Sequence, residues 1–85
     1  MYFYKEQKEK LFTEDGQVMF LKVRDKVDAL LIKAGAVRCQ EVLRGVTGDG
    51  WLMMACLDRI IELGEIREIT GNNVAGQYRV FVREG

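Results

Sequence analysis

The sequence predicts an α+β domain in which three helices are followed by a β-hairpin. Apolar residues recur at helical spacing as far as Gly64, which predicts helices over about residues 17–34, 37–44 and 50–63. After Gly64 the pattern changes to the alternation typical of strands, and we expect a hairpin over residues 66–83. With 85 residues, 48% of them hydrophobic, the chain is long and apolar enough to bury the core of one domain.

The helix over residues 50–63 has the clearest ends. Asp49 precedes an apolar run, where a carboxylate accepts hydrogen bonds from the N–H groups of the first turn, and Gly64 follows it, where glycine readily adopts the left-handed conformation that ends helices. Its buried stripe is expected to contain Met53, Cys56, Leu57, Ile60 and Ile61. Its opposite face is expected to carry Trp51, Ala55, Asp58 and Glu62, with Met54 and Arg59 on the flanks.

The helix over residues 17–34 is predicted from one apolar seam, with Thr13–Gly16 as the break and helix start before it and Gly35 as its end. The seam consists of Phe20, Val23, Val27, Leu30 and Ala34. Val18, Met19 and Leu21 add apolar surface beyond this seam, which indicates a second contact, either with the N-terminal segment or with another copy of the chain.

The predicted hairpin has two strand-like runs, residues 66–70 and 77–83, which are rich in β-branched and aromatic residues. Residues 71–76 between them contain Gly and Asn, which tolerate the positive φ of turns.

The N-terminal residues 1–16 are predicted to form an aromatic and charged arm, and residues 17–85 the domain proper. Tyr2, Phe3 and Tyr4 need burial, either on their own domain or on a partner subunit, and the sequence leaves both alternatives open.

Composition excludes several classes of function. Thirteen basic and thirteen acidic residues cancel, so no overall field attracts nucleic acid or an anionic membrane. No apolar run approaches the roughly 20 residues that a membrane span needs, and the start of the chain does not resemble a signal peptide, so we expect a cytoplasmic protein without membrane contact.

Enzymatic activity is not expected. The sequence has no histidine, which excludes triads and metal sites based on that residue. Cys39 and Cys56 are expected to be free buried thiols, and no cofactor is predicted. The glycine-containing segment 45–50 fits no phosphate-binding motif, and we interpret it as a turn and helix cap.

Two segments resemble the winged helix-turn-helix superfamily. Residues 55–66 (ACLDRIIELGEI) look like the end of its recognition helix and the start of the wing, and residues 77–82 (QYRVFV) look like the returning wing strand. The resemblance covers about residues 17–83 and implies a three-helix core with a C-terminal wing. This fold hosts transcription regulators, replication factors and protein-interaction modules, so it does not specify one function.

In that superfamily the third helix enters the major groove of double-stranded DNA and the wing contacts the backbone or the minor groove. The resemblance therefore implies a non-catalytic DNA-binding module of the transcription-regulator kind, which is our primary prediction, with Gly50, Trp51 and Arg59 facing DNA. Further candidates for phosphate contacts are Arg38, Arg44, Thr47, Arg67 and Arg79. A homodimer is expected, because one such helix reads few bases and the N-terminal aromatic residues need cover. These arginines are equally compatible with a solvated surface.

The alternative function is a protein-interaction module. The outward face of the third helix carries Asp58 and Glu62 against Arg59 alone, whereas DNA readers use basic and amide side chains. Trp51 is either half-buried against the preceding turn or exposed, and if exposed it would form with Met54 and Ala55 an apolar patch suited to a protein partner.

Overall fold

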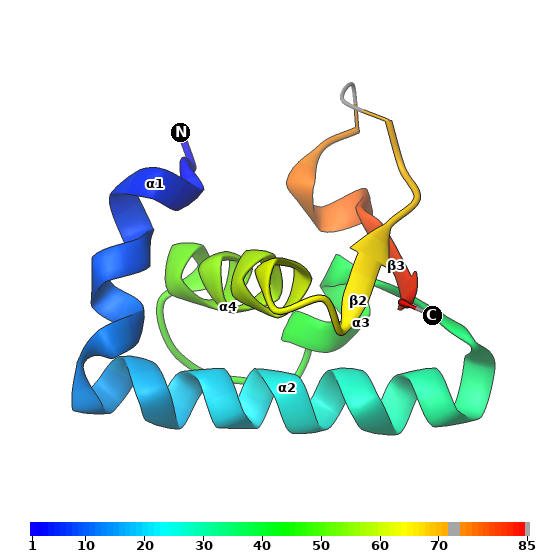
Figure 1. Ribbon diagram of the computed structural model, residues 1–85, viewed down its shortest axis with the longest axis horizontal. Helices are drawn as coiled ribbons and strands as arrows, with labels where there is room; N and C mark the ends of the chain where they lie inside the picture. Colours follow the sequence, from blue (N-terminus) through cyan, green and yellow to red (C-terminus); the bar gives the residue numbers. More distant parts are fainter. Residues whose placement is uncertain (72–73, 85) are drawn as a thin grey trace.

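The computed structural model describes residues 1–71 and 74–84, and it confirms the α+β class (Figure 1). The α-helices are α1 (Tyr4–Gln7), α2 (Glu14–Ala34), α3 (Cys39–Leu43) and α4 (Gly50–Glu62). Two 3₁₀ helices are present, η1 (Lys8–Phe12) and η2 (Gly76–Tyr78). The strands are β1 (Ala36–Arg38), β2 (Ile66–Glu68) and β3 (Val80–Arg83).

Helix α2 starts earlier than predicted. The Thr13 side chain accepts a hydrogen bond from the Gly16 N–H at 3.0 Å, so Thr13 is the N-cap and the helix begins at Glu14 rather than at residue 17. The predicted end is confirmed, since Gly35 has a left-handed φ of 77°.

The buried face of α2 also differs from the predicted seam near its end. Its buried residues are Gly16, Phe20, Val23, Val27 and Leu31. Leu30 is only half-buried against the core, so its prediction holds in part. Ala34 is exposed, and its prediction was wrong because it is the last residue of the helix.

The strands form a three-stranded antiparallel sheet in the order β1-β3-β2, where a two-stranded hairpin was predicted. Val37 of β1 pairs with Phe81 of β3, and Arg67 of β2 pairs with Val82. The predicted helix 37–44 is therefore wrong at its start: residues 36–38 form a strand, and α3 begins at Cys39. Three residues are too few to show a period, and the strand exists because β3, distant in sequence, pairs with it.

The hairpin strands are shorter than predicted, since β2 ends at Glu68 and η2 precedes β3. The Ile69 N–H still donates to the Val80 carbonyl at 2.9 Å, which extends the pairing beyond β2. Of the predicted turn 71–76, residues 72 and 73 lie outside the described part of the chain.

Helix α4 lies at the centre of the domain. Figure 1 shows it between the N-terminal helices and the sheet, with α2 running along one side. Val27, Leu57 and Phe81 from α2, α4 and β3 are 0% exposed and meet in the core. Cys39 and Cys56 are free and buried, as predicted, and burial raises the pKa of both thiols, that of Cys56 to about 12.

Residues 2–12, which we call the N-terminal segment, pack on their own domain, which answers the question that the sequence left open. Leu11 is only 1% exposed and belongs to the core, and the predicted boundary at residue 16 lies inside α2. Gly16 permits this packing, because a Cβ atom there would lie 1.9 Å from the Lys10 carbonyl oxygen. Tyr2 and Tyr4 are half-buried, whereas Phe3 is exposed.

Candidate functional site

The start of α4 projects from the surface. The Asp49 carboxylate accepts a hydrogen bond from the Trp51 N–H at 2.9 Å, which confirms Asp49 as the N-cap. This cap leaves Gly50 and Trp51 in the exposed first turn, and Trp51 is 44% exposed. Its indole ring is therefore available to a binding partner.

Further along α4 the predicted outward face is partly covered: Ala55 is buried and Asp58 half-buried, whereas Glu62 is exposed. Ala55 was expected on this face and is 0% exposed, so that prediction was wrong. The cover comes from the N-terminal segment, since α1 and η1 both pack against α4. The periodicity of α4 alone could not reveal this contact, because it depends on a segment some forty residues away in the chain.

Hydrogen bonds fasten the N-terminal segment to the two acidic residues of α4. The Tyr2 hydroxyl donates to Asp58 at 2.5 Å, and the Tyr4 hydroxyl donates to Glu62 at 2.8 Å. Lys8 forms an ion pair with Glu62 at 2.9 Å. Both carboxylates are thus engaged within the domain.

These contacts shift the pKa values of the groups that make them. Hydrogen bonds from Lys8, Arg59 and Tyr4 lower the pKa of Glu62 to about 2. Burial, followed by the hydrogen bonds to Asp58 and Glu62, raises the pKa of Tyr2 and Tyr4 above that of a free tyrosine. Glu62 therefore stays ionised and is paired within the domain, and Asp58 accepts a hydrogen bond from Tyr2.

Arg79 joins α4 to the hairpin. Its Nη2 lies 2.7 Å from Asp58 Oδ1 and 2.8 Å from Glu68 Oε1, and its side chain is 14% exposed. The Thr70 hydroxyl donates to the second oxygen of Glu68, which completes the network. Burial lowers the pKa of Arg79, but the bonds to Asp58 and Glu68 outweigh it and raise the pKa above its ordinary value. Arg79, predicted as a phosphate contact, is thus engaged in internal ion pairs.

An apolar groove of about 550 Å³ opens at the exposed start of α4. We call it the α4 groove. Its apolar lining includes Met1, Tyr2, Leu43, Trp51 and Met54, and Gln77 and Arg79 contribute polar atoms. Figure 1 shows the N-terminus and the orange segment that contains η2 on the same side of α4. Residues of both segments line the groove. Gly76 brings η2 close to α4, since a Cβ atom there would lie 2.6 Å from the Met54 Cε.

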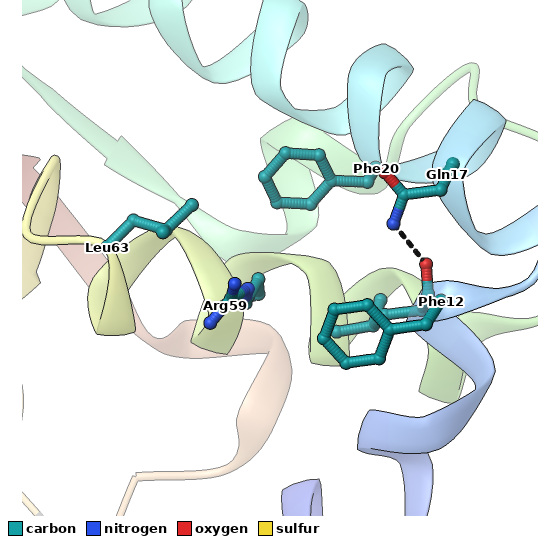
Figure 2. A pocket seen from close by; sticks show the side chains of 6 residues that line it. Phe12, Gln17, Phe20, Arg59 and Leu63 are labelled. Carbon is teal, nitrogen blue, oxygen red and sulfur yellow. Dashed lines mark hydrogen bonds between the residues drawn. The ribbon is translucent and has the colours of Figure 1, made fainter.

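A smaller pocket of about 230 Å³ lies where η1, α2 and α4 meet (Figure 2). Figure 2 shows Phe12, Phe20 and Leu63 around it, with the Arg59 guanidinium beside them. Arg59 forms an ion pair with Glu62 at 2.8 Å and lies over the Phe12 ring, 5.5 Å from its centroid. The Arg59 guanidinium therefore already has an ion-pair partner, Glu62, within the domain.

The structure brings together three of the eight predicted site residues: Gly50, Trp51 and Arg79 line the α4 groove. Arg59 lines the smaller pocket, and Arg38 lines a shallow depression beside β1. Exposed positions elsewhere are occupied by Arg44, Thr47 and Arg67. The sequence analysis did not identify Met1, Tyr2, Leu43 or Gln77 as groove residues. The aromatic start of the chain was the only signal for Tyr2, since it required burial somewhere.

Within residues 1–71 and 74–84, no three acidic or cysteine side chains gather in a way that would hold a metal ion. No helix in that part of the chain combines the length and the apolar character needed to cross a bilayer. Comparison of the chain with protein-family models, curated proteins and solved structures gives no match.

Proposed function

We propose that this chain is a non-catalytic winged-helix domain that binds a partner protein through the α4 groove. In this interpretation α2, α3 and α4 are the three helices of the superfamily layout, and β2 and β3 form the wing. The order of these elements along the chain agrees with the resemblance of residues 55–66 and 77–82 to that superfamily.

The observation that carries the proposal is the exposed apolar lining of the α4 groove. Trp51 is 44% exposed at the mouth of a concave surface, together with Met54 and Leu43. Aromatic residues and methionine are enriched at the centres of protein interfaces, where a partner removes them from water. Methionine is also flexible enough to adapt to the shape of an incoming side chain.

The contacts of α4 argue against its insertion into a DNA groove. Asp58 and Glu62 lie where a reader of bases needs donors, and both accept hydrogen bonds from the N-terminal segment. Entry of α4 into a major groove would require those bonds to break and would then bring two carboxylates close to phosphates. This arrangement favours a partner that contacts only the start of α4.

DNA binding remains the second candidate, and it is favoured by three exposed arginines. Arg38, Arg44 and Arg67 have no carboxylate within ion-pair distance in the described residues. Such side chains contact phosphates without reading sequence, and binding of this kind weakens steeply as salt rises.

A peptide selection tests the proposal. Short random peptides displayed on phage are selected on the immobilised wild-type chain alone, and the affinity of each selected peptide is then measured for the wild type and for Trp51→Ser. Because Trp51 is exposed, the substitution leaves the fold intact, which circular dichroism verifies. We expect peptides with aromatic or aliphatic anchors that bind the wild type at least ~10-fold more tightly than the variant.

The control variant is Tyr78→Ser, which removes another exposed aromatic side chain outside the groove lining. Selected peptides should bind this variant as they bind the wild type, with little change between ~50 and ~200 mM salt. Peptides that bind the wild type and Trp51→Ser equally would refute the assignment of the groove.

A further inference from the structure

The smaller pocket, where η1, α2 and α4 meet, has one cation in an otherwise uncharged lining. The lining consists of Leu11, Phe12, Gln17, Phe20, Arg59 and Leu63. Figure 2 shows the Arg59 guanidinium between Leu63 and Phe12. Among the described residues, no carboxylate belongs to this lining, so the pocket is suited to an anion rather than to a cation.

Arg59 has donors that its contacts within the domain do not use. Its Nη1 donates to Glu62 Oε1 at 2.8 Å, whereas Nε and Nη2 form no hydrogen bond with the described residues. Its side chain is 30% exposed, so a ligand can reach it. The Nε and Nη2 edge of a guanidinium matches the two oxygens of a carboxylate, and Arg24 binds Glu65 in this way at 2.9 and 2.6 Å. Arg59 can therefore bind a second carboxylate while it stays paired with Glu62.

Glu62 does not cancel the positive charge beside the pocket, because Lys8 shares its carboxylate. Lys8 Nζ lies 2.9 Å from Glu62 Oε2, and Arg59 Nη1 lies 2.8 Å from Oε1. Two cations thus contact one carboxylate, which leaves one positive charge in excess. An anion bound by Arg59 would balance that charge.

The remainder of the pocket is suited to an apolar ring. Leu11 and Phe20 are 1% and 9% exposed and form its buried wall. Phe12 and Leu63 are 59% and 46% exposed, so a bound apolar group would remove part of both side chains from water. Two phenylalanine rings in the lining also favour an aromatic occupant, because aromatic pairs gain energy beyond the area that they bury.

The volume of the pocket, about 230 Å³, limits the size of the occupant. An apolar cavity of about 150 Å³ holds one benzene molecule. The additional volume here admits a carboxyl group on a short linker, whereas a second ring would not fit.

We infer that this pocket binds a small aromatic monocarboxylate. The carboxylate pairs with Nε and Nη2 of Arg59, and the ring lies among Phe12, Phe20 and Leu63. The pocket shares no lining residue with the α4 groove, so the inference does not depend on the function proposed for that groove.

Amide NMR spectra of the full, isotope-labelled chain test this inference, with phenylacetate as the probe. We expect shifts around the pocket and a dissociation constant of about 1 mM or below, as is usual for a ligand of this size. Phenethylamine, which has the opposite charge, and acetate, which has no ring, should both bind at least ~10-fold more weakly. No shifts around the pocket at ~20 mM phenylacetate, or equal binding of phenylacetate and either comparison compound, would overturn the inference.

Two substitutions test the two halves of the site. Arg59→Met should weaken phenylacetate binding at least ~5-fold, because it removes the ion pair, and Lys8 still holds Glu62 in this variant. Phe12→Ser, at an exposed position, removes one aromatic wall and should also weaken binding, and it tests the site if Arg59→Met fails to fold. Arg67→Met is the matched control, since Arg67 is exposed and outside the pocket lining, and it should bind as the wild type does. Wild-type affinity in a folded Arg59→Met or Phe12→Ser variant would contradict the assigned site.

Discussion

At the scale of single residues, Arg79 has the largest structural role among the predicted site residues. Its guanidinium bonds to Asp58 of α4 and Glu68 of β2 and lies over the Phe81 ring at 5.1 Å. The Tyr2 hydroxyl bonds to the same Asp58, so one connected network holds the N-terminal segment, α4 and the hairpin together.

Replacement of Arg79 should therefore destabilise the fold rather than only weaken binding. Arg79→Met leaves Asp58 and Glu68 partly buried without a cation, and we expect the free energy of unfolding to fall by about 3 kcal/mol. Urea denaturation measures this change. Arg67→Met is the control, because Arg67 is exposed and outside these ion pairs, and it should alter stability by less than about 0.5 kcal/mol. Equal stability of the two variants would contradict the structural role of Arg79.

Glu62 should make stability depend on pH in the acid range. Its pKa is lowered from 4.5 to about 2, so the folded state holds this carboxylate ionised more strongly than the unfolded state does. The resulting stabilisation is present above pH 4.5 and is lost as pH falls toward 2. We expect the melting temperature of Glu62→Gln to fall less than that of the wild type over this interval.

Glu9→Gln is the matched comparison for Glu62→Gln, because Glu9 is exposed and forms no ion pair within the described residues. The melting temperature of Glu9→Gln, measured at several acid pH values, should fall with pH as steeply as that of the wild type. A Glu62→Gln variant with the wild-type slope would show that the contacts of Lys8 and Tyr4 with this carboxylate do not persist in solution.

At the scale of elements, Gly16 determines whether the N-terminal segment can pack on α2. A Cβ atom there would lie 1.9 Å from the Lys10 carbonyl oxygen and 2.8 Å from the Leu11 Cα, and both are backbone atoms that cannot move independently. Gly16→Ala should lower the free energy of unfolding by about 3 kcal/mol, as overpacking does. Amide hydrogen exchange should show loss of protection first in residues 4–12.

Gly50→Ala is the paired substitution at a permissive site. A Cβ atom at Gly50 meets nothing within 4 Å, and its φ is not positive. Alanine should raise the free energy of unfolding by about 0.5 kcal/mol, because it restricts the unfolded chain and favours the helix. If both substitutions had the same effect, the close approach at Gly16 would be wrong.

The elements that the sequence predicted well are those whose ends depend on local chemistry. Asp49 and Gly64 define α4 through a side-chain cap and a φ of 78°, and Gly35 ends α2 in the same way. Strand β1 was missed because its three residues become a strand only through pairing with β3, which lies far along the chain. The start of α2 was misplaced because Gly16 was interpreted as a break, although it lies within the first turn.

For the candidate site, the sequence showed the cap of α4 by Asp49 but left open whether Trp51 is half-buried or exposed. In the structure Asp49 caps the helix and Trp51 is 44% exposed. Ala55 was wrongly assigned to an exposed face, because the N-terminal segment packs against α4. Arg79 was assigned only as a phosphate contact, although it forms ion pairs with Asp58 and Glu68. Amphipathic periodicity describes one element at a time and does not reveal which other segment covers it.

At the scale of the whole molecule, charge and shape both favour a binding surface that is apolar rather than strongly charged. The chain carries no formal net charge, and the acidic residues of α4 are paired within the domain. The α4 groove is an apolar hollow on the described surface, and the exposed Trp51 lines it.

The emission of Trp51 tests the choice between protein and DNA most directly, because it is the only tryptophan and lines the α4 groove. The wild-type chain is titrated with mixed-sequence duplex DNA at ~50 mM and ~200 mM salt, a range over which phosphate-driven binding weakens strongly. We predict no change in emission at either salt concentration, and a change with a groove-selected peptide that is the same at both. A response to DNA at ~50 mM salt that disappears at ~200 mM would contradict the proposed function and identify the start of α4 as a nucleic-acid contact.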